Sequence, residues 1–235
     1  MSDTSGRRAL RWLVGLTVAL VGLSAAAVGL LVLRLDRVGE PAFGFLVWNL
    51  FLAWIPYGLA LGLALVHARS GPRPVLCLLG VGWLLFLPNA PYILTDFIHL
   101  GRRTGAPLWF DAALIGAFAG VGLALGLVSL LIVHRVVEAR AGRLVGWLFA
   151  VTALVLSAVG VYLGRFPRFN SWDVITDPHS LVSVVLHRLA DPFGNPFLLQ
   201  FGLLMSVLLL GSYLVAWIVG RGILGPVRTS EWSDV

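Results

Sequence analysis

Long runs of apolar residues, separated by short polar stretches, form the dominant pattern along this chain. The runs fall at about residues 12–33, 43–66, 75–94, 112–133, 144–164 and 197–220. Each is close to the length of about 20 residues that an α-helix needs to cross the hydrocarbon of a bilayer. Because apolar residues are continuous and do not alternate with polar ones, the runs indicate helices rather than the strands of a membrane barrel.

The composition supports the same interpretation. The chain has 235 residues, of which 59% are hydrophobic and 12% are charged, whereas a soluble domain carries roughly a quarter charged residues. We therefore expect a single integral membrane domain over residues 1–235, built as an all-α bundle of about six transmembrane helices. The first run follows three arginines, as a secretory signal does, but it continues to Leu33 and is longer than a signal's apolar segment.

The cationic residues suit membrane topology better than nucleic acid. All 17 of the Lys and Arg residues are arginine, against 11 acidic residues, and they lie at the ends of the apolar runs rather than in one basic stretch. This spacing gives no basic stripe that could follow a phosphate backbone, so nucleic acid is excluded as a partner. Cys77 is the single cysteine, which excludes an intramolecular disulfide and a site with several cysteine ligands.

The arginines also predict an orientation, because positive residues near span ends favour the cytoplasmic side. One set of connections holds Arg7, Arg8, Arg11, Arg69, Arg73, Arg135, Arg140, Arg143, Arg221 and Arg228. The other set is smaller and holds Arg34, Arg37, Arg102, Arg103, Arg165, Arg168 and Arg188. The excess predicts that both termini are cytoplasmic.

The third run ends in the segment FLPNAPYILTDFIHL, residues 86–100, where prolines and polar side chains replace the apolar pattern. Pro88 and Pro91 have no backbone N–H to donate, so we expect a broken helix near the outer end of this span. Carbonyl groups freed by such a break need cover from protein or water. Continued as a helix, the segment would place Asp96 and His99 on one face, beside Asn89 at the break.

Further polar residues gather at the same predicted end of the other spans. Asn49 lies in the second span and Asp111 begins the fourth, while GRFPRFNSWD at residues 164–173 follows the fifth. The last outer loop contains a short apolar stretch, residues 181–189, which predicts an interfacial or re-entrant helix. Because polar groups at membrane depth are costly, their collection on one side predicts an extracytoplasmic pocket.

The segments LPNAPYILTDFIHL, PLWFD and GRFPRFNSWD resemble those of a bacterial family named domain of unknown function 1361. The resemblance covers most of the chain, from about residue 43 to residue 220. It implies a multi-pass membrane protein and carries no activity with it. With the predicted orientation, it places the protein in the bacterial cytoplasmic (inner) membrane.

One hypothesis is a membrane enzyme, or a binding protein, for a lipid-linked or small anionic substrate at the outer face. The candidate catalytic residues are Asp96, His99, Asp111 and Asp173. The candidate substrate-binding residues are Asn49, Asn89, Arg165, Arg168, Asn170 and Trp172. Asp96 and His99 are also candidate ligands of a divalent metal, with Asp111, Asp173 or His179 completing the shell. If the pocket exists, Asp96 should lie within reach of Arg165, Arg168, Asn170 or His99, either by a direct hydrogen bond or through one water.

Two alternatives remain open from the sequence. A broken span suits a transporter or channel, although the inner halves of the spans offer almost no polar path. A structural, assembly or sensory protein is equally compatible with the pattern. Membrane lipids are expected partners. Small-residue stripes such as Gly15, Gly22 and Gly29 favour close packing of helices within the bundle, and they are also a candidate face for a homo-oligomer.

Overall fold

The computed structural model describes the chain except residues 1, 40, 102–104, 191–193, 195 and 225–235. The predicted topology residues Arg102, Arg103 and Arg228 therefore lie outside the described residues, as do the side chains of Arg7, Arg8 and Arg188. The long helices are α1 (Ser2–Val38), α2 (Phe45–Ala68), α3 (Arg73–Phe86), α5 (Leu108–Ala141), α6 (Arg143–Arg165) and α9 (Pro196–Leu224). The short helices are α4 (Asn89–Tyr92), the 3-10 helix η1 (Ile93–His99), α7 (Asp173–Thr176) and α8 (Pro178–Ala190).

Six segments of the described chain are long and apolar enough to cross a membrane, which confirms the predicted helical membrane bundle. They are Arg11–Val38, Phe45–Ala68, Arg73–His99, Leu108–Ala141, Arg143–Arg165 and Pro196–Arg221. Each one overlaps one of the predicted runs. The protein is therefore a multi-pass membrane protein with an all-helical fold.

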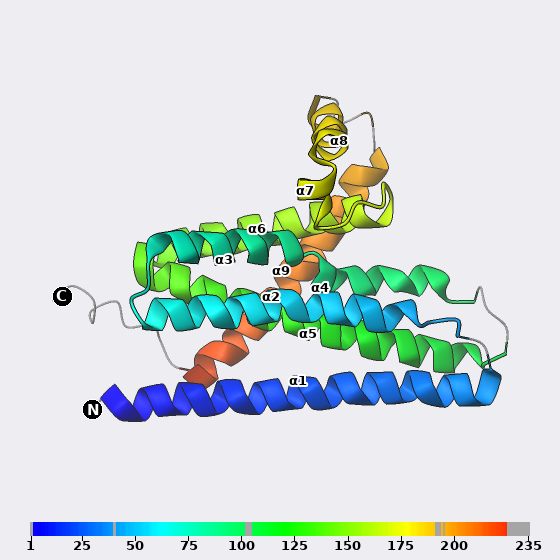
Figure 1. Ribbon diagram of the computed structural model, residues 1–235, viewed down its shortest axis with the longest axis horizontal. Coiled ribbons are helices and arrows are strands. Elements are labelled where there is room, and N and C mark those ends of the chain that lie inside the picture. Colours follow the sequence, from blue (N-terminus) through cyan, green and yellow to red (C-terminus); the bar gives the residue numbers. More distant parts are fainter. Residues whose placement is uncertain (1, 40, 102–104, 191–193, 195, 225–235) are drawn as a thin grey trace.

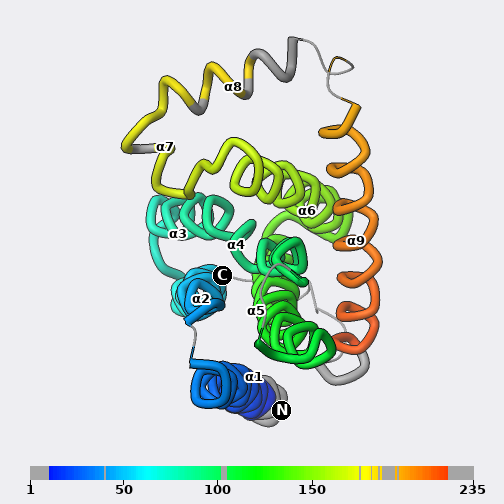
Figure 2. The backbone as a smooth tube through the Cα atoms, turned by 90° about the vertical axis from the view of Figure 1, so that its right-hand side faces the viewer, coloured from blue at the N-terminus to red at the C-terminus, as the bar shows by residue number. Residues whose placement is uncertain are grey.

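Helix α5 is the central column of the bundle. Viewed end-on, α2, α4, α6 and α9 lie around it, and α1 lies at the outside of the bundle against α5 (Figure 2). Within their most apolar windows, 61% of α5 is buried, against 17% for both α1 and α9. We call the end with the α2–α3 and α5–α6 turns the Gly142 end, and the opposite end, where α6 stops, the Arg165 end. The first residues of α1 and the last described residues of α9 lie at the Gly142 end (Figure 1).

The third span is broken where the sequence predicts it. Helix α3 ends at Phe86, and the chain shifts sideways before continuing as α4 and η1 (Figure 1). The freed carbonyls find new donors close by. The Leu87 carbonyl accepts from the Ala90 N–H at 3.1 Å, and the Phe86 carbonyl accepts from the Asn89 side chain at 3.0 Å. Local backbone and side-chain groups thus replace part of the lost helical bonding.

Glycines on α5 and α6 make room for this broken segment. A Cβ at Gly122 would lie 2.7 Å from the Ala90 carbonyl, and one at Gly126 would lie 2.8 Å from the Ala90 side chain. On the other side, a Cβ at Gly160 would lie 2.5 Å from the ring of Pro88. The break is therefore held between two helices that approach it with bare backbone, as small residues allow in membrane bundles.

The glycines of α1 behave differently. A Cβ at Gly15, Gly22 or Gly29 would meet nothing within 4 Å, so this stripe faces outward and packs against no other helix of the described chain. The face of α1 toward α2 is instead marked by hydrogen bonds, among them Thr17 to Tyr57 at 2.6 Å. Helix packing accounts for Gly122 and Gly126 but not for the α1 stripe.

The predicted interfacial or re-entrant segment is helical in the structure. It forms α8, which lies across the direction of the spans, outside the main bundle (Figures 1 and 2). Val182 and Leu186, one helical turn apart, are both more than half exposed. An exposed apolar pair on a helix that runs crosswise is typical of a segment lying in a membrane interface.

Candidate functional site

Asp96 is the centre of the polar cluster at the Arg165 end. It lies in η1 and is 1% exposed, deep between the helices that flank the broken span. One carboxylate oxygen, Oδ2, accepts a hydrogen bond from the Asn49 side chain at 2.9 Å. The other, Oδ1, accepts from Nη2 of Arg165 in a buried ion pair. Both oxygens are thus engaged by side chains from α2 and α6.

Arg165 is held on three sides. Its Nε donates to the Thr95 hydroxyl at 2.7 Å, and its Nη2 donates to Asp96. The guanidinium also lies over the ring of Tyr92, 4.5 Å from its centroid, in cation–π contact. Thr95 donates in turn to the Tyr92 carbonyl at 2.6 Å. The last turn of α6 is therefore tied to α4 and η1 through one side chain.

This contact confirms the prediction that Asp96 lies within hydrogen-bonding reach of one of four named residues, and that residue is Arg165. The 3-10 geometry of η1 explains the orientation. With three residues per turn, Ile93, Asp96 and His99 align along one side of the segment. Ile93 and Asp96 are buried, and the half-buried His99 ring packs against Phe45 with centroids 5.1 Å apart.

Among the described residues, no group of three or more His, Cys, Asp or Glu side chains lies close enough together to hold a metal ion. His99 packs on an aromatic ring, and Asp96 already accepts from two donors. A metal site at Asp96 and His99 therefore stays a prediction, and the described residues around them supply no further His, Cys, Asp or Glu ligand.

Asp111 belongs to a second buried pair rather than to the Asp96 cluster. Its Oδ1 lies 2.7 Å from Nε of Arg34, and its Oδ2 accepts from Nη2 of the same arginine at 3.4 Å. Arg34 is 1% exposed and its guanidinium lies over Phe43, 4.7 Å from the ring centroid. The pair joins α1 to the start of α5, and a catalytic role of Asp111 stays a prediction.

The remaining predicted residues form a third group near the end of α6. Asn89 donates to the Ser171 hydroxyl at 2.8 Å, so it ties the break to the segment after α6. Asp173 accepts from the Asn170 N–H at 2.6 Å and from Thr176 at 3.1 Å, contacts that stabilise the start of α7. Trp172 is 38% exposed. The hydrogen bonds of the described residues thus group the polar residues of this end into separate clusters, and a pocket shared by them stays a prediction.

Arg168 has an exposed side chain and a backbone φ of +65°. Only glycine adopts such a conformation readily, and other residues typically lose about 1–2 kcal/mol there. Strain of this kind persists where the surrounding structure fixes the backbone, and it occurs often at functional positions. The positive φ therefore makes Arg168 a candidate for a functional role.

A polar cluster that the sequence did not predict lies at the opposite end. His134 is 1% exposed, and its Nδ1 lies 2.5 Å from the hydroxyl of Tyr213, while its ring packs edge-on to Trp147. The sequence predicts that the inner half of the bundle has almost no polar groups, but this half contains the buried pair His134–Tyr213. The predicted span ends at residue 133, just before His134, whereas α5 continues as a helix to Ala141.

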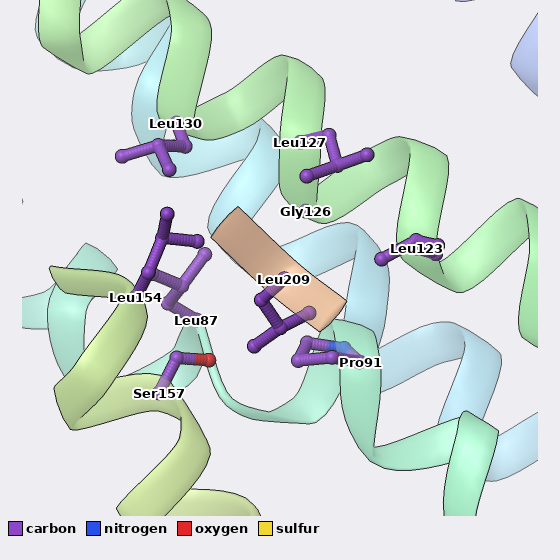
Figure 3. Close-up of a pocket in the computed structure, with 9 residues that line it drawn as sticks. All are labelled: Leu87, Pro91, Leu123, Gly126, Leu127, Leu130, Leu154, Ser157 and Leu209. Carbon is purple, nitrogen blue, oxygen red and sulfur yellow. The ribbon is translucent and has the colours of Figure 1, made fainter. Parts of the chain in front are cut away.

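A small cavity lies beside the break, between α5, α6 and α9. Its lining is apolar except for one hydroxyl (Figure 3), and the residues are Leu87, Pro91, Leu123, Gly126, Leu127, Leu130, Leu154, Ser157 and Leu209. Ser157 is buried, and its hydroxyl has no hydrogen-bond partner among the described residues. A lining of this kind lacks the polar side chains that a path for a charged substrate uses.

Comparison with known proteins gives a family and no activity. A protein-family model described as "Protein of unknown function (DUF1361)" matches residues 48–211. Neither the curated proteins nor the solved structures contain a match to the chain. The matched range includes Asn49, Asp96, Asp111 and Arg165.

Proposed function

The chain belongs to the protein family of unknown function DUF1361, and we propose that it binds a phosphate-bearing anionic ligand at the Arg165 end. The ligand is either a lipid-linked phosphate or a small soluble anion. In this proposal Arg165 and Arg168 provide the positive charge, and Asp96 holds Arg165 in position.

The observation that carries this proposal is the fixed orientation of Arg165. Its Nε and Nη2 are used by Thr95 and Asp96, while Nη1 has no acceptor among the described residues. The side chain keeps 12% of its surface exposed, so the guanidinium is not sealed off. A guanidinium with a set orientation and open N–H groups matches the geometry of phosphate oxygens, and little entropy is lost when it binds.

Arg168 supplies the second charge. It follows Arg165 by three residues, its side chain is exposed, and its backbone has a φ of +65°. Hydrogen bonds between arginine and phosphate are charge-assisted and about twice as strong as neutral ones. The exposed indole of Trp172 suits a ligand that enters from the membrane interface.

The other predicted site residues have positioning roles in this proposal. Asn49 and Asn89 donate to Asp96 and Ser171, so we assign both to positioning rather than to ligand contact. Asp96 is bonded through both oxygens, which favours support of Arg165 over general-base catalysis. The geometry therefore supports binding more directly than a chemical reaction.

We place both termini in the cytoplasm of a bacterial cell, on the basis of the arginine distribution. The Arg165 end would then face outward, and its ligand would come from the outer leaflet or the extracytoplasmic space. The start of α1 and the end of α9 lie at one end of the bundle, which fits an even number of crossings (Figure 1).

The test is a binding assay on the full chain in nanodiscs of phosphatidylcholine. The soluble probe is inorganic pyrophosphate, and the lipid probe is phosphatidic acid added to the disc. We expect one of them to raise the unfolding temperature of the wild type, and Arg168→Gln to weaken that binding about tenfold or more. Arg37→Gln, which removes an exposed arginine of α1, serves as the charge-matched control and should leave binding unchanged.

Each outcome has a consequence. A response to pyrophosphate alone that Arg168→Gln weakens identifies a soluble anion, and a response to phosphatidic acid alone that Arg168→Gln weakens identifies a lipid phosphate at this end. If the wild type responds to neither probe, or if both variants bind as the wild type does, the proposal is wrong.

A further inference from the structure

Four exposed arginines gather on two neighbouring turns at the Gly142 end. Arg69 and Arg73 lie at the α2–α3 turn, and Arg140 and Arg143 lie at the α5–α6 turn. The turns are linked directly, because Nε of Arg140 donates to Nδ1 of His67 at 2.8 Å. The four side chains therefore belong to one surface, which we call the basic turn surface.

The positive charge of this surface is not balanced locally. Residues 61–75 contain no acidic side chain, and residues 136–150 contain one, Glu138. The salt bridges Arg34–Asp111 and Arg165–Asp96 both lie toward the other end. Arg140 donates to an imidazole ring rather than to a carboxylate. The basic turn surface thus keeps a strong positive charge with its guanidinium groups exposed.

The surface also lies at the level where a lipid headgroup would be. Leu78 follows Arg73 by five residues and is 73% exposed, and Leu144, next to Arg143, is also 73% exposed. Five residues of helix correspond to about 7.5 Å, so the change from lipid-facing leucine to arginine occurs within about the thickness of a headgroup layer. Arginine stems at such positions extend along the apolar surface and place their charge among lipid phosphates.

We propose that the basic turn surface binds the headgroup of an anionic phospholipid. A phosphate group between the two turns would accept hydrogen bonds from Arg73 and Arg143, and Arg140 would be oriented toward it by its contact with His67. Basic residues between the ends of transmembrane helices commonly recognise anionic lipids in this way. The site uses residues at the opposite end from Arg165 and Arg168, so it is correct or wrong independently of the proposed function.

The experiment uses the full chain in nanodiscs made of phosphatidylcholine alone or with phosphatidylglycerol, followed by native mass spectrometry of the lipids that remain bound. We expect the wild type to retain phosphatidylglycerol in preference to phosphatidylcholine. Removing one arginine near a lipid surface weakens binding about fivefold, so Arg73→Gln with Arg143→Gln should lower the affinity roughly 30-fold.

The controls separate this site from a general effect of net charge. Arg143→Gln and Arg37→Gln each remove one positive charge, and only the first should lose affinity for phosphatidylglycerol. The unfolding temperature in phosphatidylcholine alone shows whether a variant still folds, and we expect it to stay unchanged because these side chains are exposed. Equal retention by the double variant and by Arg37→Gln would overturn the proposal, as would a wild type without preference for phosphatidylglycerol.

Discussion

Asp96 and Arg165 form a buried ion pair between the 3-10 segment of the third span and the last turn of α6. Asn49 adds a donor from α2, so three spans meet at one carboxylate. A buried pair is costly to disrupt from one side, since the remaining charge is left without its partner. We infer that the ion pair holds the broken third span in place against α6.

The first prediction concerns the coupling within this pair. Asp96→Ala and Arg165→Ala should each destabilise the protein by about 3–5 kcal/mol, because each leaves an uncompensated buried charge. The double variant should lose much less than the sum of the two. The measurement is unfolding in detergent of the two single variants and the double variant. Asp173→Asn, which alters an exposed cluster, should cost no more than about 1 kcal/mol. Additive losses at Asp96 and Arg165 would show that the pair does not act as a unit.

The sequence was informative where a residue type dictates backbone structure. Continuous apolar runs predicted the six spans, and Pro88 predicted the break, because proline cannot donate within a helix at any position in any fold. The contact between Asp96 and one of four residues, Arg165 among them, was predictable because these residues lie at the same end of neighbouring spans. These inferences need only local chemistry and membrane geometry.

The sequence was less informative about which partner a polar side chain chooses. Asp111 and Asp96 both stand near arginines along the bundle end, and only the packing of α1 against α5 assigns Arg34 to Asp111. Helix length caused the other error. No glycine or proline interrupts α5 between His134 and Ala141, so the helix runs beyond the predicted span and buries His134.

The second prediction tests how α6 accommodates the break. Gly160→Ala should destabilise the protein by about 1–3 kcal/mol, because the new methyl group would overlap the fixed ring of Pro88. Gly120→Ala on α5 is the matched control. A Cβ there meets nothing within 4 Å, so this substitution should leave stability unchanged or raise it by up to about 1 kcal/mol. Equal unfolding temperatures for the two variants would argue against close packing at Pro88.

The third prediction concerns orientation in the membrane. In a Cys77→Ser background, Ala106→Cys marks the Arg165 end and Ala141→Cys marks the Gly142 end. A membrane-impermeant maleimide applied to intact cells should label the cysteine at residue 106 and leave that at residue 141 unmodified until the cells are permeabilised. The expectation rests on the larger number of arginines at the Gly142 end. The reverse labelling pattern would place the Arg165 end in the cytoplasm.

The last prediction separates stability from binding at Arg168. Glycine adopts a φ of +65° without strain. Arg168→Gly should therefore leave the free energy of unfolding unchanged or raise it by up to about 1 kcal/mol. The same variant should weaken binding of the phosphate-bearing probe by about tenfold or more, because a charge-assisted hydrogen bond is lost. Ser70→Gly is the control for strain, since Ser70 has a φ of +51° at the Gly142 end. Its stability should change in the same direction while binding stays constant. If Arg168→Gly instead loses stability and keeps its affinity, this arginine serves the fold, and the strained backbone needs a different explanation.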